Sequence, residues 1–303
     1  MNEKLKIPSV YIIISLIWGS TWLAIRIGLE SLTPFLSAGL RFLVAALVIY
    51  LLMLIKKLPI QKDKMALKLY LQMGFFSFII PFGLVYWGQQ FIASGLASVL
   101  FGVYPFFVAI FSKIVMPEEK IELVKIIGMV LGFVGIIFIF SDNLDFKLDS
   151  DFLGMSAVLL SGIMQSTIAV TIKKNGKHLN SLSMNLIPML LAGIVMTAGA
   201  FFVEDLSRVK FDFKAVSTVL YLGVFGSVVT FTSYYWLLKR INILLLSLIA
   251  FITPVIAMLL GWIFYNETLQ NHHLIGSGFV LIGLLFANLS NIKLKNKLYT
   301  GLR

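Results

Sequence analysis

Arg41 is the side chain with the most unusual chemical setting in the sequence, because it stands inside the apolar run LSAGLRFLVAAL at residues 36–47. A cation inside a lipid-spanning helix costs about 2.5–3.5 kcal/mol even on insertion scales, so some group must compensate it. A guanidinium can bind a substrate carboxylate or phosphate through two parallel hydrogen bonds. It can equally act as a clamp to backbone carbonyls or to an acid such as Glu30 or Glu267. The sequence leaves both roles open.

Aromatic, hydroxyl and amide side chains are the other polar groups inside the apolar runs. They are Trp18, Tyr86, Gln89, Tyr104, Gln165, Thr167, Asn185, Thr230, Tyr234, Tyr235 and Thr253. Tyrosine and tryptophan combine an apolar face with one polar group, which suits a small amphipathic solute. We predict that these residues, apart from Thr167 and Tyr234, join Arg41 as substrate contacts. Tyr86 and Tyr104 are the preferred candidates, because their helices are expected to face a solute pathway.

Acidic residues and histidines avoid the interiors of these runs. Every Asp, Glu and His falls in a connection or within about one turn of the end of a run. Buried carboxylates and imidazoles form the proton relays of pumps, so the sequence favours facilitated diffusion or exchange over proton coupling. Glu118 and Glu267 each follow a run. We expect them to stabilise the amino end of the next helix, where a negative charge meets the positive end of the helix dipole.

Catalytic and metal-binding motifs are missing from the sequence. It contains no Walker loop, no HExxH and no zinc-ligand cluster, and the count of 0 Cys excludes disulfides and thiolate chemistry. His178, His272 and His273 lie in connections and match no catalytic spacing. We therefore expect no enzyme activity, no catalytic residue, no metal and no cofactor.

Ten long apolar stretches must position these side chains. The chain is 59% hydrophobic and 13% charged, with a mean hydropathy of +0.96, which is far more apolar than a soluble domain. Each stretch reaches the roughly 20 residues that a helix needs to cross a bilayer, and none alternates like a barrel strand. The stretches are residues 8–28, 34–55, 68–88, 94–116, 122–140, 152–172, 182–203, 215–237, 243–265 and 272–290. An all-α membrane protein with ten transmembrane helices is predicted.

Basic residues gather at one side of these helices. With both termini in the cytoplasm, most of the 25 Lys and Arg residues fall on the inner side, and the outer connections keep only Lys147, Arg208, Lys210 and Lys214. This split follows the positive-inside rule and predicts a multi-pass protein of the cytoplasmic membrane, surrounded by lipid. The net charge of +11 thus indicates orientation. Because the cations form short clusters at helix ends, no nucleic-acid partner is expected.

The chain repeats itself at a shift of 149 residues. The matches include Gly74 with Gly223, Phe82 with Phe231, Tyr86 with Tyr235, Pro105 with Pro254 and Glu118 with Glu267, while a weaker match at a shift of 146 pairs Leu36–Ser37 with Leu182–Ser183. The predicted repeats are residues 8–140 and 152–290. Each holds five helices, an odd number, so the second half enters the membrane from the opposite side and the halves are inverted. Such halves commonly enclose a transport pathway near the midplane.

Proline and glycine indicate how the helices bend and pack. Pro105 and Pro254 occupy matching places in the fourth helix of each half, where a missing N–H and a steric clash bend a helix. We predict that they are bends of gating helices beside a cavity, since freed carbonyls need water or protein. Gly128 and Gly132 form a GxxxG motif. It predicts close helix contacts either within the fold or between protomers, so a homodimer is an alternative to a monomer.

Motifs in the first, second and fourth helices follow a recognisable order. The first helix reads IWGSTWLAIRIG at 17–28, the second reads LSAGLRFLVAAL at 36–47, and each fourth helix ends in a proline, an apolar run and a glutamate. Over nearly its whole length the chain resembles the EamA branch of the drug/metabolite transporter superfamily. The resemblance implies ten helices, cytoplasmic termini and a central cavity lined by the first four helices of each half. Relatives export amino acids and related metabolites, and the superfamily also includes sugar, nucleotide-sugar and drug carriers.

The expected function is therefore an alternating-access carrier that exports small metabolites, with amino acids or their derivatives preferred. A flippase or carrier of a lipid-linked or sugar-like substrate is one alternative, which requires a lateral opening and places a headgroup phosphate at Arg41. A non-transporting membrane scaffold or sensor is another, and it predicts a solid core between the halves. A cavity between the halves would separate the carrier from the scaffold.

Overall fold

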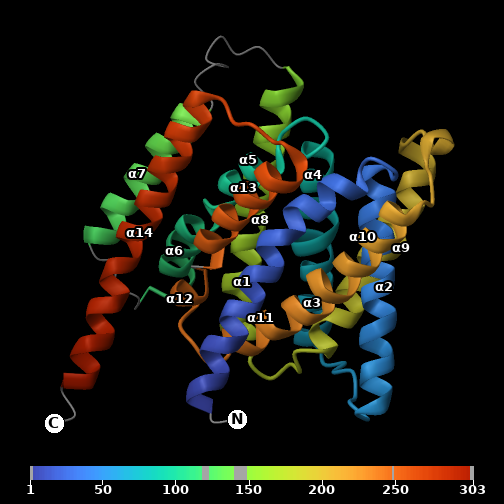
Figure 1. The fold of residues 1–303 in the computed structure, drawn as a ribbon. Helices are drawn as coiled ribbons and strands as arrows, with labels where there is room; N and C mark the ends of the chain where they lie inside the picture. Colours follow the sequence, from blue (N-terminus) through green and yellow to red (C-terminus); the bar gives the residue numbers. More distant parts are fainter. Residues whose placement is uncertain (1–2, 118–122, 140–148, 248, 301–303) are drawn as a thin grey trace.

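The computed structural model describes residues 3–117, 123–139, 149–247 and 249–300, and all regular structure within these ranges is helical (Figure 1). Seven helices of these ranges are long and apolar enough to cross a membrane. They are Leu5–Gly28, Pro34–Ile55, Lys64–Gly88, Ser94–Val115, Ser150–Asn175, Ser183–Val203 and Phe213–Leu238. Ile126–Ile139 and Ile252–Tyr265 are shorter apolar helices. The predicted all-helical class is confirmed, and the count of ten crossings stays a prediction.

The helices follow one another with short connections. In chain order they are α1 (Glu3–Gly28), α2 (Pro34–Ile55), α3 (Lys64–Met73), the π-helix η1 (Gly74–Ile79), α4 (Ile80–Gly88), α5 (Ser94–Phe101), α6 (Tyr104–Val115), α7 (Leu123–Ile139), α8 (Ser150–Asn175), α9 (Ser183–Val203), the 3₁₀-helix η3 (Leu206–Arg208), α10 (Phe213–Gly223), the π-helix η4 (Val224–Val229), α11 (Thr230–Leu238), α12 (Ile243–Ser247), α13 (Ile249–Tyr265) and α14 (Asn271–Thr300).

Local sequence determines where several helices begin. Asp63, Asp149 and Asp212 precede α3, α8 and α10, and each carboxylate accepts a hydrogen bond from the backbone N–H three residues later at 2.8–3.0 Å. Such caps satisfy N–H groups that have no partner inside the helix. Pro34 stands in the first turn of α2, where its fixed φ angle suits helix entry and no N–H is needed.

A π-helical turn interrupts two of the membrane-spanning helices at matching places. Gly74–Ile79 lies between α3 and α4, and Val224–Val229 lies between α10 and α11. A π turn inserts one extra residue into the α-helical register and loosens the backbone hydrogen bonding, and it is frequent at functional sites. In the first half, Pro81 follows directly in the first turn of α4 and cannot donate a backbone hydrogen bond. The π turns were not predicted from the sequence.

Helix packing is similar in the two halves. Helix α1 contacts α10, α11 and α13, and its counterpart α8 contacts α4, α5 and α6. Helix α2 packs on α9, and α7 packs on α14. The pair α7 and α14 stands at the left edge of the molecule in Figure 1, beside the other helices. Helices α7 and α14 are therefore peripheral, which agrees with a cavity lined by the first four helices of each half.

Glycines bring α7 and α14 into backbone contact. A Cβ atom at Gly135 would lie 2.5 Å from the carbonyl oxygen of Gly276, and one at Gly283 would lie 2.4 Å from the carbonyl oxygen of Gly128. Only glycine permits this approach. The GxxxG glycines therefore make helix contacts within one chain.

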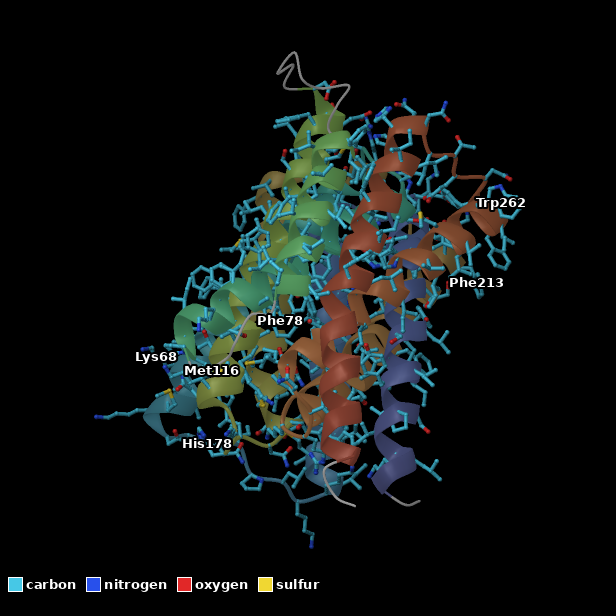
Figure 2. The ribbon with its side chains drawn as sticks, turned by 90° about the vertical axis from the view of Figure 1, so that its left-hand side faces the viewer. Lys68, Phe78, Met116, His178, Phe213 and Trp262 are labelled. Atoms are coloured by element: carbon cyan, nitrogen blue, oxygen red, sulfur yellow. The ribbon has the colours of Figure 1, made fainter. Side chains whose placement is uncertain are left out.

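The bundle has an apolar centre and two polar ends. Phe78 lies near the middle of the molecule, His178 and Lys68 lie toward the lower end, and Trp262 lies near the upper end (Figure 2). Phe78 is fully buried, whereas Trp262 is 65% exposed. Helix α1 begins and α14 ends at the lower end in Figure 1.

A turn interrupts the fourth predicted span close to Pro105. Helix α5 ends at Phe101, a turn follows, and Pro105 stands in the first turn of α6. Pro105 thus starts a new helix, where its missing N–H leaves nothing unpaired. Its counterpart Pro254 lies inside α13 (Ile249–Tyr265).

Candidate binding cavity

A cavity of about 110 Å³ lies between the two halves of the chain. Its wall comes from α1, α2, η1, α4, α5, α6, α8, α11, α12 and α13. The lining residues are Trp18, Thr21, Trp22, Ile25, Arg41, Ser77, Phe82, Val85, Phe101, Tyr104, Gln165, Ala169, Phe231, Tyr234, Tyr235, Leu246, Ser247, Ile249, Ala250 and Thr253. Helix α9, one of the eight helices that the resemblance places around the cavity, contributes none of them, because it packs on the far side of α2.

Arg41 joins the two halves at this wall. Its Nε donates to the Ser227 hydroxyl at 2.8 Å, and its Nη2 donates to the Gly226 carbonyl at 2.9 Å. Its Nη1 donates to the Tyr86 hydroxyl at 3.3 Å. The guanidinium also lies over the ring of Phe82, 4.8 Å from the centroid. The π turn η4 therefore supplies two of the acceptors that hold this cation, and Arg41 is only 2% exposed.

Two predicted contacts, Tyr86 and Gln89, lie behind the cavity wall. Tyr86 is fully buried and reaches the cavity only through its bond to Arg41. Gln89 is also fully buried, and its amide nitrogen donates to the Trp22 carbonyl at 3.3 Å. Its Oε1 has no hydrogen-bond partner among the described residues. Both side chains support wall residues in this conformation.

Tyr104 and Tyr234 face each other across the cavity, with their hydroxyl oxygens 2.7 Å apart. Tyr104 comes from α6 of the first half, and Tyr234 comes from α11 of the second. The ring of Tyr104 stacks on Phe101 at a centroid distance of 5.9 Å, and the ring of Tyr234 contacts Trp18 at 5.4 Å. This pair forms a second polar link between the halves, surrounded by aromatic faces.

The remaining predicted contacts divide between the wall and its surroundings. Gln165, Tyr235 and Thr253 line the cavity. Asn185 and Thr230 are fully buried away from it. The amide nitrogen of Asn185 donates to the Ser181 carbonyl, and the Thr230 hydroxyl donates to the Gly226 carbonyl at 2.8 Å. Thr230 therefore shares its acceptor with Arg41.

Several wall residues were not among the predicted contacts. Trp22 follows Trp18 by one helical turn, so the aromatic spacing on one face of α1 offered a signal. Tyr234 neighbours Tyr235 and was noted only as an interior polar group. Ser77 on the wall and Ser227, which accepts from Arg41 behind it, lie in the π turns, whose register gives no signal in the sequence.

Carboxylates from the second half stabilise helix ends of the first half at the upper end of the bundle. Glu267 accepts hydrogen bonds from the Ser94 backbone N–H at 2.9 Å, from its hydroxyl at 2.8 Å and from the Gly95 N–H at 3.2 Å. Glu204 accepts bonds from the backbone N–H groups of Phe35 and Leu36. The expectation that Glu267 stabilises the next helix, α14, is wrong, because the connection folds back onto α5. Glu118 lies outside the described residues.

A third carboxylate at this end, that of Glu30, belongs to the first half and binds side chains of the second half. It accepts hydrogen bonds from Lys214 and from the Tyr265 hydroxyl, both in the second half. These bonds, first that of Lys214, lower the pKa of Glu30 from its usual 4.5. Asp212 accepts a bond from the Ser31 hydroxyl at 2.7 Å close by. Charged and polar groups thus connect the halves around the upper end.

At the lower end of the bundle, lysine side chains bind backbone carbonyls near the ends of helices. The Lys173 ammonium donates to the carbonyls of Leu238 and Ile241 at 2.5 and 2.8 Å, just where α11 ends. Lys239 donates to the carbonyl of Leu179. Cations at carboxyl ends of helices match the negative end of the helix dipole. Lysine ammonium groups thus hold helix termini at the lower end, as Glu204 and Glu267 do at the upper end.

Comparison with known sequences points to one class of protein. The sequence pattern described as the EamA-like transporter family matches residues 6–141 and 152–289. "Uncharacterized transporter YoaV" of Bacillus subtilis is 29% identical over 273 residues, which cover 89% of this chain and 92% of the relative. "Protein PagO" of Salmonella typhimurium is 28% identical, covering 90% of each chain. "Uncharacterized inner membrane transporter YedA" of Escherichia coli K12 is 27% identical, covering 90% of this chain and 88% of the relative.

A solved crystal structure has a similar fold. It superimposes with a TM-score of 0.72 and covers 94% of this chain and 98% of its own, at 15% sequence identity. At that identity the likeness concerns the fold alone.

Proposed function

The chain belongs to the EamA-like transporter family, and from that premise we infer that this multi-pass membrane protein exports small metabolites, with amino acids and their derivatives as the substrate class. The observation that carries the proposal is the cavity of about 110 Å³ between the halves. A scaffold or sensor would have a solid core at this place, since protein interiors are otherwise close-packed. Export and the amino-acid class rest on the resemblance to exporters.

The proposed framework is a pair of inverted repeats, residues 8–140 and 152–290, that together cross the membrane ten times. The matching π turns and the matching helix contacts support it. Because each half crosses the membrane five times, the second half enters the membrane from the opposite side. The interface between the two halves is then the pathway.

Six of the predicted contact residues are proposed to touch the substrate. They are Trp18, Arg41, Tyr104, Gln165, Tyr235 and Thr253, all on the cavity wall. The wall is mainly aromatic with a few polar groups, which suits a small amphipathic solute. Tyr86 and Thr230 act through Arg41 and the Gly226 carbonyl. Gln89 and Asn185 meet the solute only in another conformation of the cycle.

Alternating access is the proposed mechanism. The upper end is then the outer side, held closed by Glu30, Glu204 and Glu267, and both termini are cytoplasmic. The turn before Pro105 and the proline Pro254 inside α13 serve as bends of the gating helices, because a turn or a proline lets a helix change direction. No Asp, Glu or His belongs to the cavity wall as the structure describes it, which supports facilitated diffusion or exchange.

Counterflow in proteoliposomes tests the function. Purified protein would be reconstituted with unlabelled amino acids inside and a panel of radiolabelled amino acids outside, with and without a pH gradient. We expect transient accumulation of at least one label, unaffected by the gradient. Accumulation that depends on the gradient would indicate proton coupling. Failure to accumulate any label over a broad panel of amino acids, sugars and organic acids would overturn the carrier proposal.

A further inference from the structure

We propose that the cavity recognises its substrate through a carboxylate held by Arg41, and that an ammonium group on the substrate is not required. The ligand class is a small apolar monocarboxylate, of which an aliphatic amino acid is the aminated form. This inference rests on the proposed carrier function and adds the charged group that the site selects.

The cation at this wall lacks a counter-ion. All three hydrogen-bond acceptors of Arg41 are neutral: the Ser227 hydroxyl, the Gly226 carbonyl and the Tyr86 hydroxyl. The cavity lining, as far as the structure describes the chain, contains no Asp or Glu. The acidic side chains of Glu204 and Glu267 bind backbone N–H groups at helix ends instead. A guanidinium stays protonated in proteins, so its charge remains for a ligand to balance.

Arg41 also keeps hydrogen-bond donors for a ligand. A guanidinium has five N–H groups, one on Nε and two on each terminal nitrogen. Nε, Nη1 and Nη2 each donate once within the described chain, so Nη1 and Nη2 each retain one N–H. The two oxygens of a carboxylate can accept these two bonds side by side. The three protein contacts hold the guanidinium fixed, which lowers the entropy lost on binding.

The rest of the wall offers an ammonium little. The other polar lining groups are hydroxyls such as those of Thr21 and Thr253, the amide of Gln165 and two indole N–H groups, and none of them carries a negative charge. The aromatic faces of Trp18 and Tyr104 attract a cation, but the same cavity places it near the like charge of Arg41. This wall therefore stabilises a bound carboxylate, whereas it does not stabilise a ligand that carries only an ammonium group.

Charge and volume restrict the class further. One guanidinium balances one negative charge, whereas a phosphate monoester brings nearly two, so a monoanion fits the described wall. An apolar cavity of about 150 Å³ in another protein holds benzene. A cavity of about 110 Å³ therefore suits a branched aliphatic group of the size of a leucine side chain.

Four probes that share the isobutyl group of leucine test the inference. They are L-leucine, 4-methylpentanoate, L-leucinamide and isopentylamine, which carry both charges, the carboxylate alone, the ammonium with a neutral amide, and the ammonium alone. Binding to the full chain in nanodiscs would be followed by the fluorescence of the wall residues Trp18 and Trp22. We expect 4-methylpentanoate to bind within a few-fold of leucine, and leucinamide and isopentylamine to bind at least tenfold more weakly.

An internal counter-ion provides a test that leaves Arg41 in place. Thr21 lies beside the guanidinium, since a Cβ at Gly226 would be 2.9 Å from Thr21 Cγ2 and 3.4 Å from Arg41 Nη2. Thr21→Asp places a carboxylate where the ligand carboxylate is proposed to bind. Thr21→Asn has the same shape without the charge and is the matched control. We expect Thr21→Asp to weaken 4-methylpentanoate binding at least tenfold relative to Thr21→Asn.

The outcomes separate this inference from the carrier function. Equal binding of the amine and the carboxylate, or equal binding by Thr21→Asp and Thr21→Asn, would overturn carboxylate recognition even if counterflow of some solute persists. Binding of none of the four probes would overturn it as well. Counterflow with the broad panel then decides separately whether the protein is a carrier.

Discussion

Among the side chains that the structure describes, Arg41 is the buried cation of the interior, and its partners come from both halves of the chain. Arg41 on α2 bonds to Tyr86 of its own half and to Ser227 and Gly226 of the other. Removing a partner from a buried charge is costly, because the charge then lacks solvation from either protein or water. The contacts of Arg41 therefore matter for stability as well as for any ligand.

The first prediction compares two partners of Arg41. Ser227→Ala removes the 2.8 Å bond from Nε and should lower the free energy of unfolding by about 1.5–3 kcal/mol. Tyr86→Phe removes the longer, 3.3 Å bond and should cost less than about 1.5 kcal/mol. Thermal denaturation of both variants in the same detergent measures the order. A greater loss in Tyr86→Phe would contradict the clamp geometry.

At the level of residues, the sequence predicted the chemical types at the site better than their positions. Arg41, Tyr104 and Thr253 lie on the wall, but Asn185 and Thr230 do not. The reason is physical: in a membrane helix apolar on all sides, hydrophobic periodicity does not show which face points inward. A lone polar side chain can satisfy itself on its own backbone, as Thr230 does at the Gly226 carbonyl.

At the level of elements, uninterrupted apolar length predicted the helices, and composition could not predict their interruptions. The π turns Gly74–Ile79 and Val224–Val229 share no proline, and the matched glycines Gly74 and Gly223 at their starts do not by themselves indicate a π turn. They depend on packing in three dimensions. One of these turns contributes to the site directly, because η4 presents the carbonyl of Gly226 and the hydroxyl of Ser227 to Arg41.

The second prediction concerns the peripheral pair α7 and α14. Gly283→Ala places a Cβ 2.4 Å from the Gly128 carbonyl oxygen, so the helices must separate, at a cost of about 1–3 kcal/mol in unfolding free energy. Gly278→Ala on the same helix meets no atom within 4 Å and should be neutral or stabilising by up to about 1 kcal/mol. Thermal denaturation of the two variants measures the difference. Equal midpoints would show that the helices do not pack as described.

At the level of the whole molecule, the proposed mechanism makes the upper end the closed, outer side of the cavity. The third prediction uses Glu267→Gln, which weakens the charge-assisted bonds to Ser94 and Gly95. The chain has 0 Cys, so Thr253→Cys gives a single reporter on the cavity wall. We expect labelling by an impermeant thiol reagent outside intact cells to become severalfold faster when both changes are present.

Asp205→Asn is the matched control for that experiment. Asp205 is an acid at the same end whose described partners are local, since it accepts hydrogen bonds from Ser207 and lies 3.7 Å from the Nε of Arg208. It should leave the labelling rate of Thr253→Cys unchanged. If both variants accelerate labelling equally, the effect comes from surface charge and Glu267 does not hold the end closed.

The fourth prediction is a dependence of stability on pH through Glu30. Hydrogen bonds from Lys214 and Tyr265 lower its pKa below 4.5, so the ionised form stabilises the folded state. This contribution is present above about pH 4.5 and is lost as the pH falls through the lowered pKa. We expect the melting temperature of the native chain to exceed that of Glu30→Gln at about pH 6 and the difference to shrink toward about pH 3. A constant difference would rule out ionisation as its source.

The clamp at Arg41 also bears on how the two halves came to depend on each other. The weaker repeat match pairs Leu36–Ser37 with Leu182–Ser183, and the same shift places Ile187 opposite Arg41. An ancestral five-helix unit that paired with a second copy of itself would have brought two such arginines to one seam, where like charges repel. Because Arg41 and Tyr86 stand in one half and Ser227 and Gly226 stand in the other, neither half can form this clamp alone.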